Sequence, residues 1–129
     1  MILYTTVGVS DLDHSVKFYG ALFGVMGLDL CFLDRSSASW GRKEDPDVTR
    51  FSIGYPFEGL PSSGNGTMTA FRIPAADLVD RLHALALKHG GRDESKPGRR
   101  PQYGATFYNG YVRDPDGNKL AFICNEGAA

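Results

Sequence analysis

The same order of predicted elements occurs twice along this chain, and this repetition limits the folds that it can adopt. Residues 2–9 alternate between the two faces of a strand, and residues 12–23 follow with the apolar spacing of a helix. Three short β-rich segments come next, near residues 28–34, 37–42 and 48–55. After a segment rich in Gly, Pro and Ser, residues 67–73 again have the pattern of a strand. The repetition indicates an internal duplication, in which residues 4–9 superpose on residues 68–73 and residues 50–53 on residues 119–122.

The second half continues as the first does. We expect Pro74 to open a helix whose apolar stripe is formed by Leu78, Leu82, Leu85 and His89. Gly90 and Gly91 supply the signal that ends a helix. The strands predicted after it are a short one near residues 91–95 and longer ones at 107–113 and 119–125, with a polar loop at 96–105.

These elements predict an α+β fold. Two βαβββ modules would form curved mixed sheets around a concave cleft, with the helices outside. The expected boundaries are 1–58 for the first module, 59–66 for the linker and 67–126 for the second module, within one compact domain. Strand alternation divides the side chains between the two faces. Val7, Val9, Phe71 and Ile73 are expected beneath the helices, and Tyr4, Thr6, Met68, Ala70 and Arg72 on the concave side.

Composition limits the classes of partner. The chain has 129 residues and a formal net charge of -1, so its global charge favours neither nucleic acid nor an anionic membrane. It contains no apolar run near the ~20 residues that span a bilayer, and its start does not resemble a signal peptide, so we expect a cytoplasmic protein. Cys31 and Cys124 are too few for a disulfide framework and are expected to be reduced.

Three sequence motifs carry a family resemblance. They are Val9-Ser-Asp-Leu-Asp-His-Ser-Val-Lys-Phe-Tyr19, Gly64-Asn-Gly-Thr-Met-Thr-Ala-Phe-Arg-Ile-Pro74, and Arg100-Pro-Gln-Tyr103 followed by Tyr111-Val-Arg-Asp-Pro-Asp-Gly-Asn118. In this order and spacing the chain resembles the vicinal oxygen chelate superfamily, which includes glyoxalase I, bleomycin resistance proteins, fosfomycin resistance enzymes and extradiol dioxygenases. The resemblance covers essentially the whole chain and implies a homodimer. It predicts a fold and leaves the reaction open, because this fold hosts many chemistries.

The resemblance also implies where a divalent metal would be held. Its ligands would come from the first and last strands of each module, and those places fall on Tyr4, Met68 and Ala121, with a fourth on or near Ser52. Alanine has no donor atom, methionine offers a soft thioether, and tyrosine binds metal only as phenolate. We therefore predict no metal and no other cofactor. His14, His83 and His89 all lie on predicted helices or their ends, away from the cleft strands.

The side chains expected around the cleft favour an organic ligand instead. Aromatic rings, hydroxyls and an adaptable methionine are the usual lining of a small-molecule pocket. The predicted ligand-binding residues are Tyr4, Trp40, Ser52, Met68, Arg72, Tyr103, Tyr108 and Ala121. Lys96, Arg99 and Arg100 form a basic cluster that is either a solvated loop or an anion contact at the rim.

Two functions from different classes are predicted, and a third possibility stays open, in which the cleft is vestigial and the protein acts only through its surface. The first is a metal-free binding protein of the bleomycin-resistance type, which holds a small aromatic or amphipathic molecule. The second is a glyoxalase- or dioxygenase-type enzyme, a lyase or an oxidoreductase, with an atypical or absent metal site. In the second case Tyr4 or Tyr103 would serve as general acid or base, which requires a tyrosine pKa far below its usual value.

Overall fold

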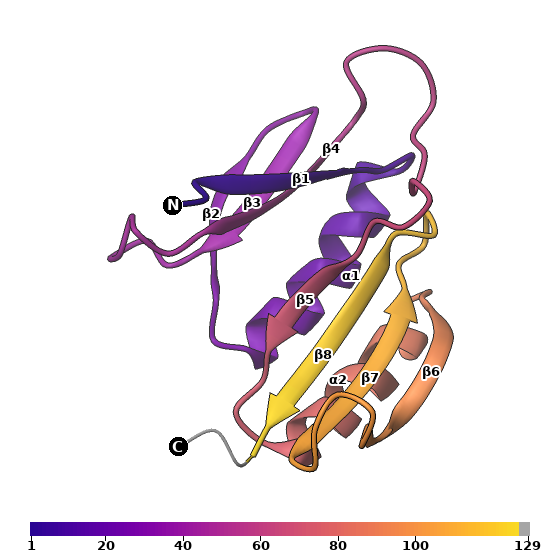
Figure 1. Ribbon diagram of the computed structural model, residues 1–129. Coiled ribbons are helices and arrows are strands. Elements are labelled where there is room, and N and C mark those ends of the chain that lie inside the picture. Colours follow the sequence, from indigo (N-terminus) through magenta and orange to yellow (C-terminus); the bar gives the residue numbers. More distant parts are fainter. Residues whose placement is uncertain (127–129) are drawn as a thin grey trace.

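The computed structural model describes residues 1–126 and contains two four-stranded mixed sheets, each with one helix (Figure 1). The first module consists of β1 (Tyr4–Gly8), α1 (Leu12–Val25), β2 (Asp29–Leu33), β3 (Ser37–Gly41) and β4 (Arg50–Gly54). The second consists of β5 (Thr69–Arg72), α2 (Ala76–Lys88), β6 (Arg92–Arg99), β7 (Phe107–Arg113) and β8 (Lys119–Asn125). The predicted order of elements and the α+β class are confirmed. No helix in residues 1–126 has the length and apolar character needed to cross a membrane.

The two sheets repeat one topology and one register. Their strand orders are β1-β4-β3-β2 and β5-β8-β7-β6, and in each the first strand pairs in parallel with the last. Thr6 lies opposite Ser52 in the first sheet, and Ala70 lies opposite Ala121 in the second. This matches the superposition of the halves expected from the sequence, in which Ser52 and Ala121 hold equivalent places.

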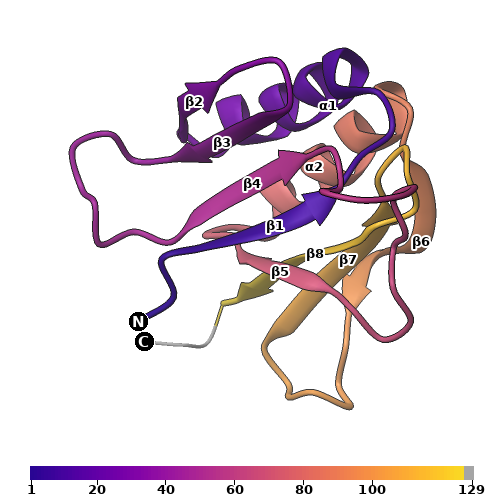
Figure 2. The ribbon, with the colours of Figure 1, turned by 90° about the horizontal axis from the view of Figure 1, so that it is seen from above.

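Both helices lie against one face of the sheets and leave the other face open (Figure 2). The side chains expected beneath the helices are there, because Val9 and Ile73 are buried in the core and Val7 and Phe71 pack against it. One hydrophobic cluster includes residues of both modules. Phe23 of α1 joins them, since its ring centroid lies 5.4 Å from that of Phe51 and 5.5 Å from that of Phe71.

A buried polar network also links the modules. The Tyr19 hydroxyl of α1 donates to Asp114 Oδ2 at 2.5 Å, although Asp114 belongs to the turn between β7 and β8. Asp114, 1% exposed, also accepts from the backbone N–H groups of Asp116 and Asn118 and from Asn118 Nδ2. Asn118 Nδ2 in turn lies 2.9 Å from the carbonyl oxygen of Gly8 in β1. Burial, and then the negative charge of Asp114, raises the pKa of Tyr19 well above its usual value.

The structure corrects two expectations about the second module. β6 extends to Arg99, where a loop from residue 96 was predicted, because an edge strand tolerates Pro97 and its pairing with β7 shifts register twice. α2 begins at Ala76, after Pro74. Its fully buried residues are Val79, Leu82, His83 and Ala86. Leu78 and Leu85 of the predicted stripe are half-buried and pack against the core, so the buried face is wider than predicted and includes His83.

The cysteines agree with expectation, and α1 has a side-chain cap at its N-terminus. Cys31 and Cys124 are both free thiols. Asp11 is the N-cap of α1, and its carboxylate accepts a hydrogen bond from the backbone N–H of His14 at 3.2 Å.

Candidate ligand-binding site

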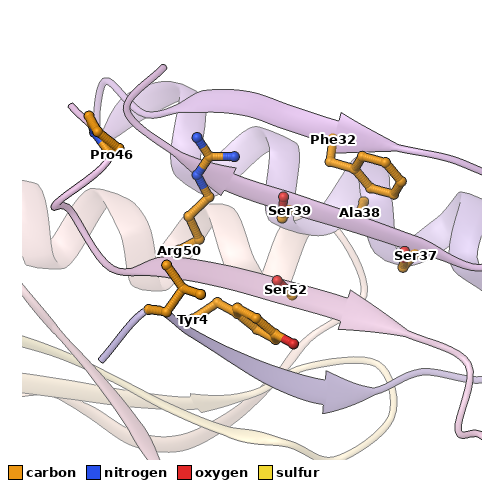
Figure 3. Close-up of a pocket in the computed structure, with 9 residues that line it drawn as sticks. Tyr4, Phe32, Ser37, Ala38, Ser39, Pro46, Arg50 and Ser52 are labelled. Carbon is orange, nitrogen blue, oxygen red and sulfur yellow. The ribbon is translucent and has the colours of Figure 1, made fainter. Parts of the chain in front are cut away.

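The open face of the first sheet is hollowed into a pocket of about 400 Å³, which we call the serine pocket (Figure 3). It is lined by Leu3, Tyr4, Phe32, Ser37, Ala38, Ser39, Pro46, Arg50 and Ser52. Register explains the grouping, because Tyr4 lies opposite Arg50, and Ser39 lies opposite both Phe32 and Ser52. Cross-strand neighbours share a face, so aromatic, hydroxyl and guanidinium groups gather on one surface.

Arg50 gives the serine pocket its charge. The guanidinium of Arg50 reaches over β3 on the side of Ser39 in Figure 3. It forms no ion pair with any carboxylate in residues 1–126. An unpaired guanidinium beside serine hydroxyls suits a ligand with an anionic or hydrogen-bond-accepting group. Phe32 and Tyr4, 50% and 59% exposed, offer apolar surface beside it.

The second sheet carries a separate hollow of about 710 Å³ on its open face, which we call the tyrosine pocket. Its lining comprises Met68, Glu94, Ser95, Arg100, Gln102, Tyr103, Phe107, Asn109, Tyr111, Lys119 and Ile123. The Tyr111 ring is flanked by two cations, with Lys119 Nζ 5.3 Å and Arg100 Cζ 5.7 Å from its centroid. Arg100 therefore belongs to a pocket, which favours the anion-contact interpretation for this residue, whereas Arg99 forms an ion pair with Glu126.

One wall of the tyrosine pocket contains an ion pair. Glu94 Oε2 lies 2.9 Å from Arg113 Nε, and this hydrogen bond lowers the pKa of Glu94 below its usual value. A carboxyl group whose pKa is lower in the folded state stabilises the fold above its unfolded pKa, about 4.3, and loses that contribution as the pH falls through the folded pKa. Glu94→Gln is therefore expected to melt a little below the wild type at pH 7 and level with it near pH 3.

Thermal melts at the two pH values test this expectation. The gap at pH 7 should be small, because both side chains of the pair are partly solvent-exposed. Glu58→Gln, at an exposed position, is the control and should melt with the wild type throughout. A gap for Glu94→Gln that is as wide at pH 3 as at pH 7 would contradict the assigned role.

The predicted ligand-binding residues are divided among several surfaces. Tyr4 and Ser52 line the serine pocket, whereas Met68 and Tyr103 line the tyrosine pocket. Arg72 lines a smaller hollow of about 260 Å³ at the end of the second sheet. Ala121 is on the same face as Tyr111, its cross-strand neighbour, but is fully buried.

Two of the predicted residues lie on the opposite face of their sheets. Trp40 is 3% exposed and packs against Phe23 of α1, with 5.2 Å between ring centroids. Tyr108 packs against the core, and its hydroxyl donates to Asp80 Oδ1 of α2 at 2.6 Å. This hydrogen bond raises the pKa of Tyr108 above its usual value. The expectation that these two side chains face the cleft is corrected, because strand alternation directs both toward the helices.

The ligand-binding residues predicted from the sequence omit several residues that line the pockets, among them Arg50, Asn109 and Lys119. Alternation along β7 predicts that Asn109 lies on the same face as Tyr111, because the two are two residues apart. Nothing in the sequence indicated that this face is the open one. Arg50 and Lys119 begin β4 and β8, at equivalent places in the two modules. The superposition of the two halves aligns Arg50 with Lys119, and the positive charge that both carry was the feature of the sequence that could have indicated them as pocket residues.

The four positions that a metal would use in the resembling family do not suit one here. They hold a phenol, a hydroxyl, a thioether and a methyl group, from Tyr4, Ser52, Met68 and Ala121. Within residues 1–126 no three His, Cys, Asp or Glu side chains are grouped so that they could hold a metal ion.

The comparisons with known proteins agree with the fold and its open-faced sheets. Residues 1–122 match the model of the Glyoxalase/Bleomycin resistance protein/Dioxygenase superfamily, and the chain belongs to this superfamily. A glyoxalase/bleomycin resistance protein from Albidiferax ferrireducens is similar at 32% identity and a TM-score of 0.86, over 96% of this chain and 98% of that one. No curated protein matches the chain.

More distant solved structures share the fold. A glyoxalase-related enzyme from Fulvimarina pelagi superposes with a TM-score of 0.77 at 21% identity, over 97% of this chain and 88% of that one. A lactoylglutathione lyase from Agrobacterium tumefaciens superposes with a TM-score of 0.66 at 20% identity, over 98% of this chain and 94% of that one. At these identities the likeness concerns the fold alone.

Proposed function

We propose that this protein is a metal-free small-molecule binding protein of the bleomycin-resistance type. Its ligand is a small aromatic or amphipathic molecule held on the open faces of the sheets. The observation that carries the proposal is the chemistry of those faces: rings, hydroxyls and unpaired cations line the pockets, while the four family metal positions hold Tyr4, Ser52, Met68 and Ala121. Sequestration needs affinity alone, so it survives the loss of a metal.

The proposal includes a homodimer. Large apolar side chains are exposed around the serine pocket and along the edge strand β2, namely Leu3, Leu30, Phe32 and Leu33. Exposed apolar surface of this kind marks an interaction site, and a second copy of the chain would cover it and help to close the open pocket. Analytical ultracentrifugation should give a mass of twice 14.1 kDa. A monomer at micromolar concentration would remove this part of the proposal.

Thermal shift with a panel of aromatic and amphipathic compounds tests the binding function. A ligand present at 100 times its Kd adds about 2.7 kcal/mol to the free energy of unfolding, or roughly 10 °C in Tm for a chain of this size. For anionic hits in the serine pocket, Arg50→Met should reduce the shift, whereas Arg35→Met, in the exposed turn before β3, should keep it. A panel in which no compound raises Tm would count heavily against binding.

Metal analysis separates this function from the enzymatic alternative. Purified protein incubated with Ni²⁺, Zn²⁺, Mn²⁺ or Fe²⁺ and then desalted should retain far less than one equivalent per chain. One tightly held equivalent would overturn the metal-free proposal and direct attention to lyase or oxidoreductase chemistry. Tyr4 and Tyr103 would then be the first residues to replace.

A further inference from the structure

Asn109 in β7 has an unmet hydrogen-bonding group at the tyrosine pocket. The side chain is 1% exposed, and its Nδ2 donates to the Tyr111 hydroxyl at 3.1 Å. Its Oδ1 has no hydrogen-bond partner among the described residues. Buried polar atoms are paired in the great majority of cases, so an orphaned acceptor at a pocket indicates a partner from outside the chain.

The register of β7 places the Asn109 side chain on the open side of the sheet. Asn109 lies opposite Ile123, and Tyr111 lies opposite Ala121, so these side chains share one face. The alternate residues of β8, Leu120 and Phe122, belong to the core beneath α2. Asn109 and Ile123 both line the tyrosine pocket.

The same pocket carries positive charge without a matching carboxylate. Glu94 is engaged by Arg113, and within residues 1–126 neither Lys119 nor Arg100 forms an ion pair. The Arg100 guanidinium is held in place by hydrogen bonds that it donates to Ser95 Oγ and to two backbone carbonyl oxygens. Both cations lie over the Tyr111 ring, as described above. Tyr111 is two residues from Asn109, about 7 Å along the strand. The Tyr111 ring lies between the two groups, because the cations lie over the ring and the Asn109 amide contacts its hydroxyl.

Building on the proposed binding function, we infer that the tyrosine pocket takes a single-ring organic acid with a hydrogen-bond donor at the far end of its ring. The carboxylate faces Lys119 and Arg100, and the O–H or N–H group donates to Asn109 Oδ1. The ring lies against Met68, Tyr103 and Phe107, the apolar and aromatic part of the lining. The donor selects among acids, because an acid without it leaves Asn109 Oδ1 unpaired.

The test uses four probes with one ring each: 4-hydroxybenzoate, benzoate, 4-formylbenzoate and 4-hydroxybenzamide. Their affinities are measured by following backbone amide NMR signals during titration. 4-Hydroxybenzoate should bind at least about fivefold more tightly than benzoate. This difference in affinity corresponds to the net free energy of one hydrogen bond. 4-Formylbenzoate carries only an acceptor and should bind no better than benzoate, and the neutral 4-hydroxybenzamide should bind more weakly than 4-hydroxybenzoate.

Three variants assign these differences to residues. Asn109→Leu keeps the branched shape, should fold at least as stably as the wild type, and should lower the affinity for 4-hydroxybenzoate to that for benzoate. Lys119→Met should weaken both acids about fivefold and leave 4-hydroxybenzamide unchanged. Lys88→Met, in the last turn of α2, is the matched control and should change nothing.

Several results would overturn the inference. Two concern the ligands: equal affinities for 4-hydroxybenzoate and benzoate, or a higher affinity for 4-formylbenzoate than for benzoate. Two concern the site: unchanged selectivity in Asn109→Leu, or NMR chemical-shift changes that centre on Tyr4 and Ser52. The last is the absence of binding of any probe at 10 mM. If the four probes fail while the compound panel yields ligands, this inference falls and the binding function stands. If the panel also yields none, both fall.

Discussion

Replacing Asp114 with alanine is expected to lower the free energy of unfolding by at least about 3 kcal/mol. The carboxylate is buried and accepts from the Tyr19 hydroxyl, two backbone N–H groups and the Asn118 amide. Alanine would remove the acceptor that these donors share and would leave the buried Tyr19 hydroxyl and Asn118 N–H without a partner. For a chain of this size the loss corresponds to a fall in Tm of roughly 12 °C, measurable by calorimetry or urea unfolding.

The exposed Asp47, in the loop between β3 and β4, provides the matched control. Asp47→Ala should leave the urea midpoint within about 0.5 kcal/mol of the wild type. A loss for Asp114→Ala no larger than that of Asp47→Ala would show that the network does not hold the modules together. A double-mutant cycle with Tyr19→Phe then isolates the contribution of the hydroxyl–carboxylate pair.

Because the pKa of Tyr19 is raised, the stability that this network contributes depends on pH in the alkaline range. The folded state holds the phenol proton more tightly than the unfolded state, where the pKa is near 10. Stability from this group is therefore complete below about pH 10 and is lost as the pH rises further, because the unfolded state releases its proton first. Tyr19→Phe should melt closer to the wild type at pH 10.5 than at pH 8.

Truncating Phe23 to alanine is expected to cost about 3–5 kcal/mol. Phe23 is 1% exposed, and its ring packs against Tyr19, Trp40, Phe51 and Phe71, with centroids 5.2–5.7 Å apart. The first three partners belong to the first module and Phe71 to the second. The cavity left by the ring therefore lies where the modules join, and the two should unfold together in one transition.

Phe57→Ala is the control for this experiment. Phe57 lies in the segment between β4 and β5 and is fully exposed, so the same truncation should change the urea midpoint very little. Two separate transitions in Phe23→Ala, or a cost below about 1 kcal/mol, would contradict a shared core. If Phe23→Ala does not fold, Phe23→Leu, which leaves a smaller cavity, answers the same question.

Both networks bear on binding, because they hold the sheets whose open faces carry the pockets. The serine pocket belongs to the first sheet and the tyrosine pocket to the second. A variant that loosens the contact between modules should therefore leave each pocket lined by the same strands. This separates stability effects from the direct effects expected for Arg50, Asn109 and Lys119.

Local pattern in the sequence was sufficient for the architecture. The order of one strand, one helix and three strands occurs twice along the chain and predicted the two modules. The alternation of residues in the first strand of each module predicted which side of β1 and β5 the helices cover. It also put Ser52 and Ala121 in equivalent places. Such predictions hold because helix and strand periods are properties of neighbouring residues along the chain.

The placement of Trp40, Tyr108 and Asn109 was decided by the tertiary structure. Alternation determines which residues of a strand share a face, but the pairing partners and the helix above determine which face is covered. Trp40 therefore faces α1 and Tyr108 faces α2, while Asn109 is turned toward the open side. The orphaned oxygen and the two unpaired cations at Tyr111 exist only because β6, β7 and β8 bring distant segments together, and such long-range pairing leaves no local trace in the sequence.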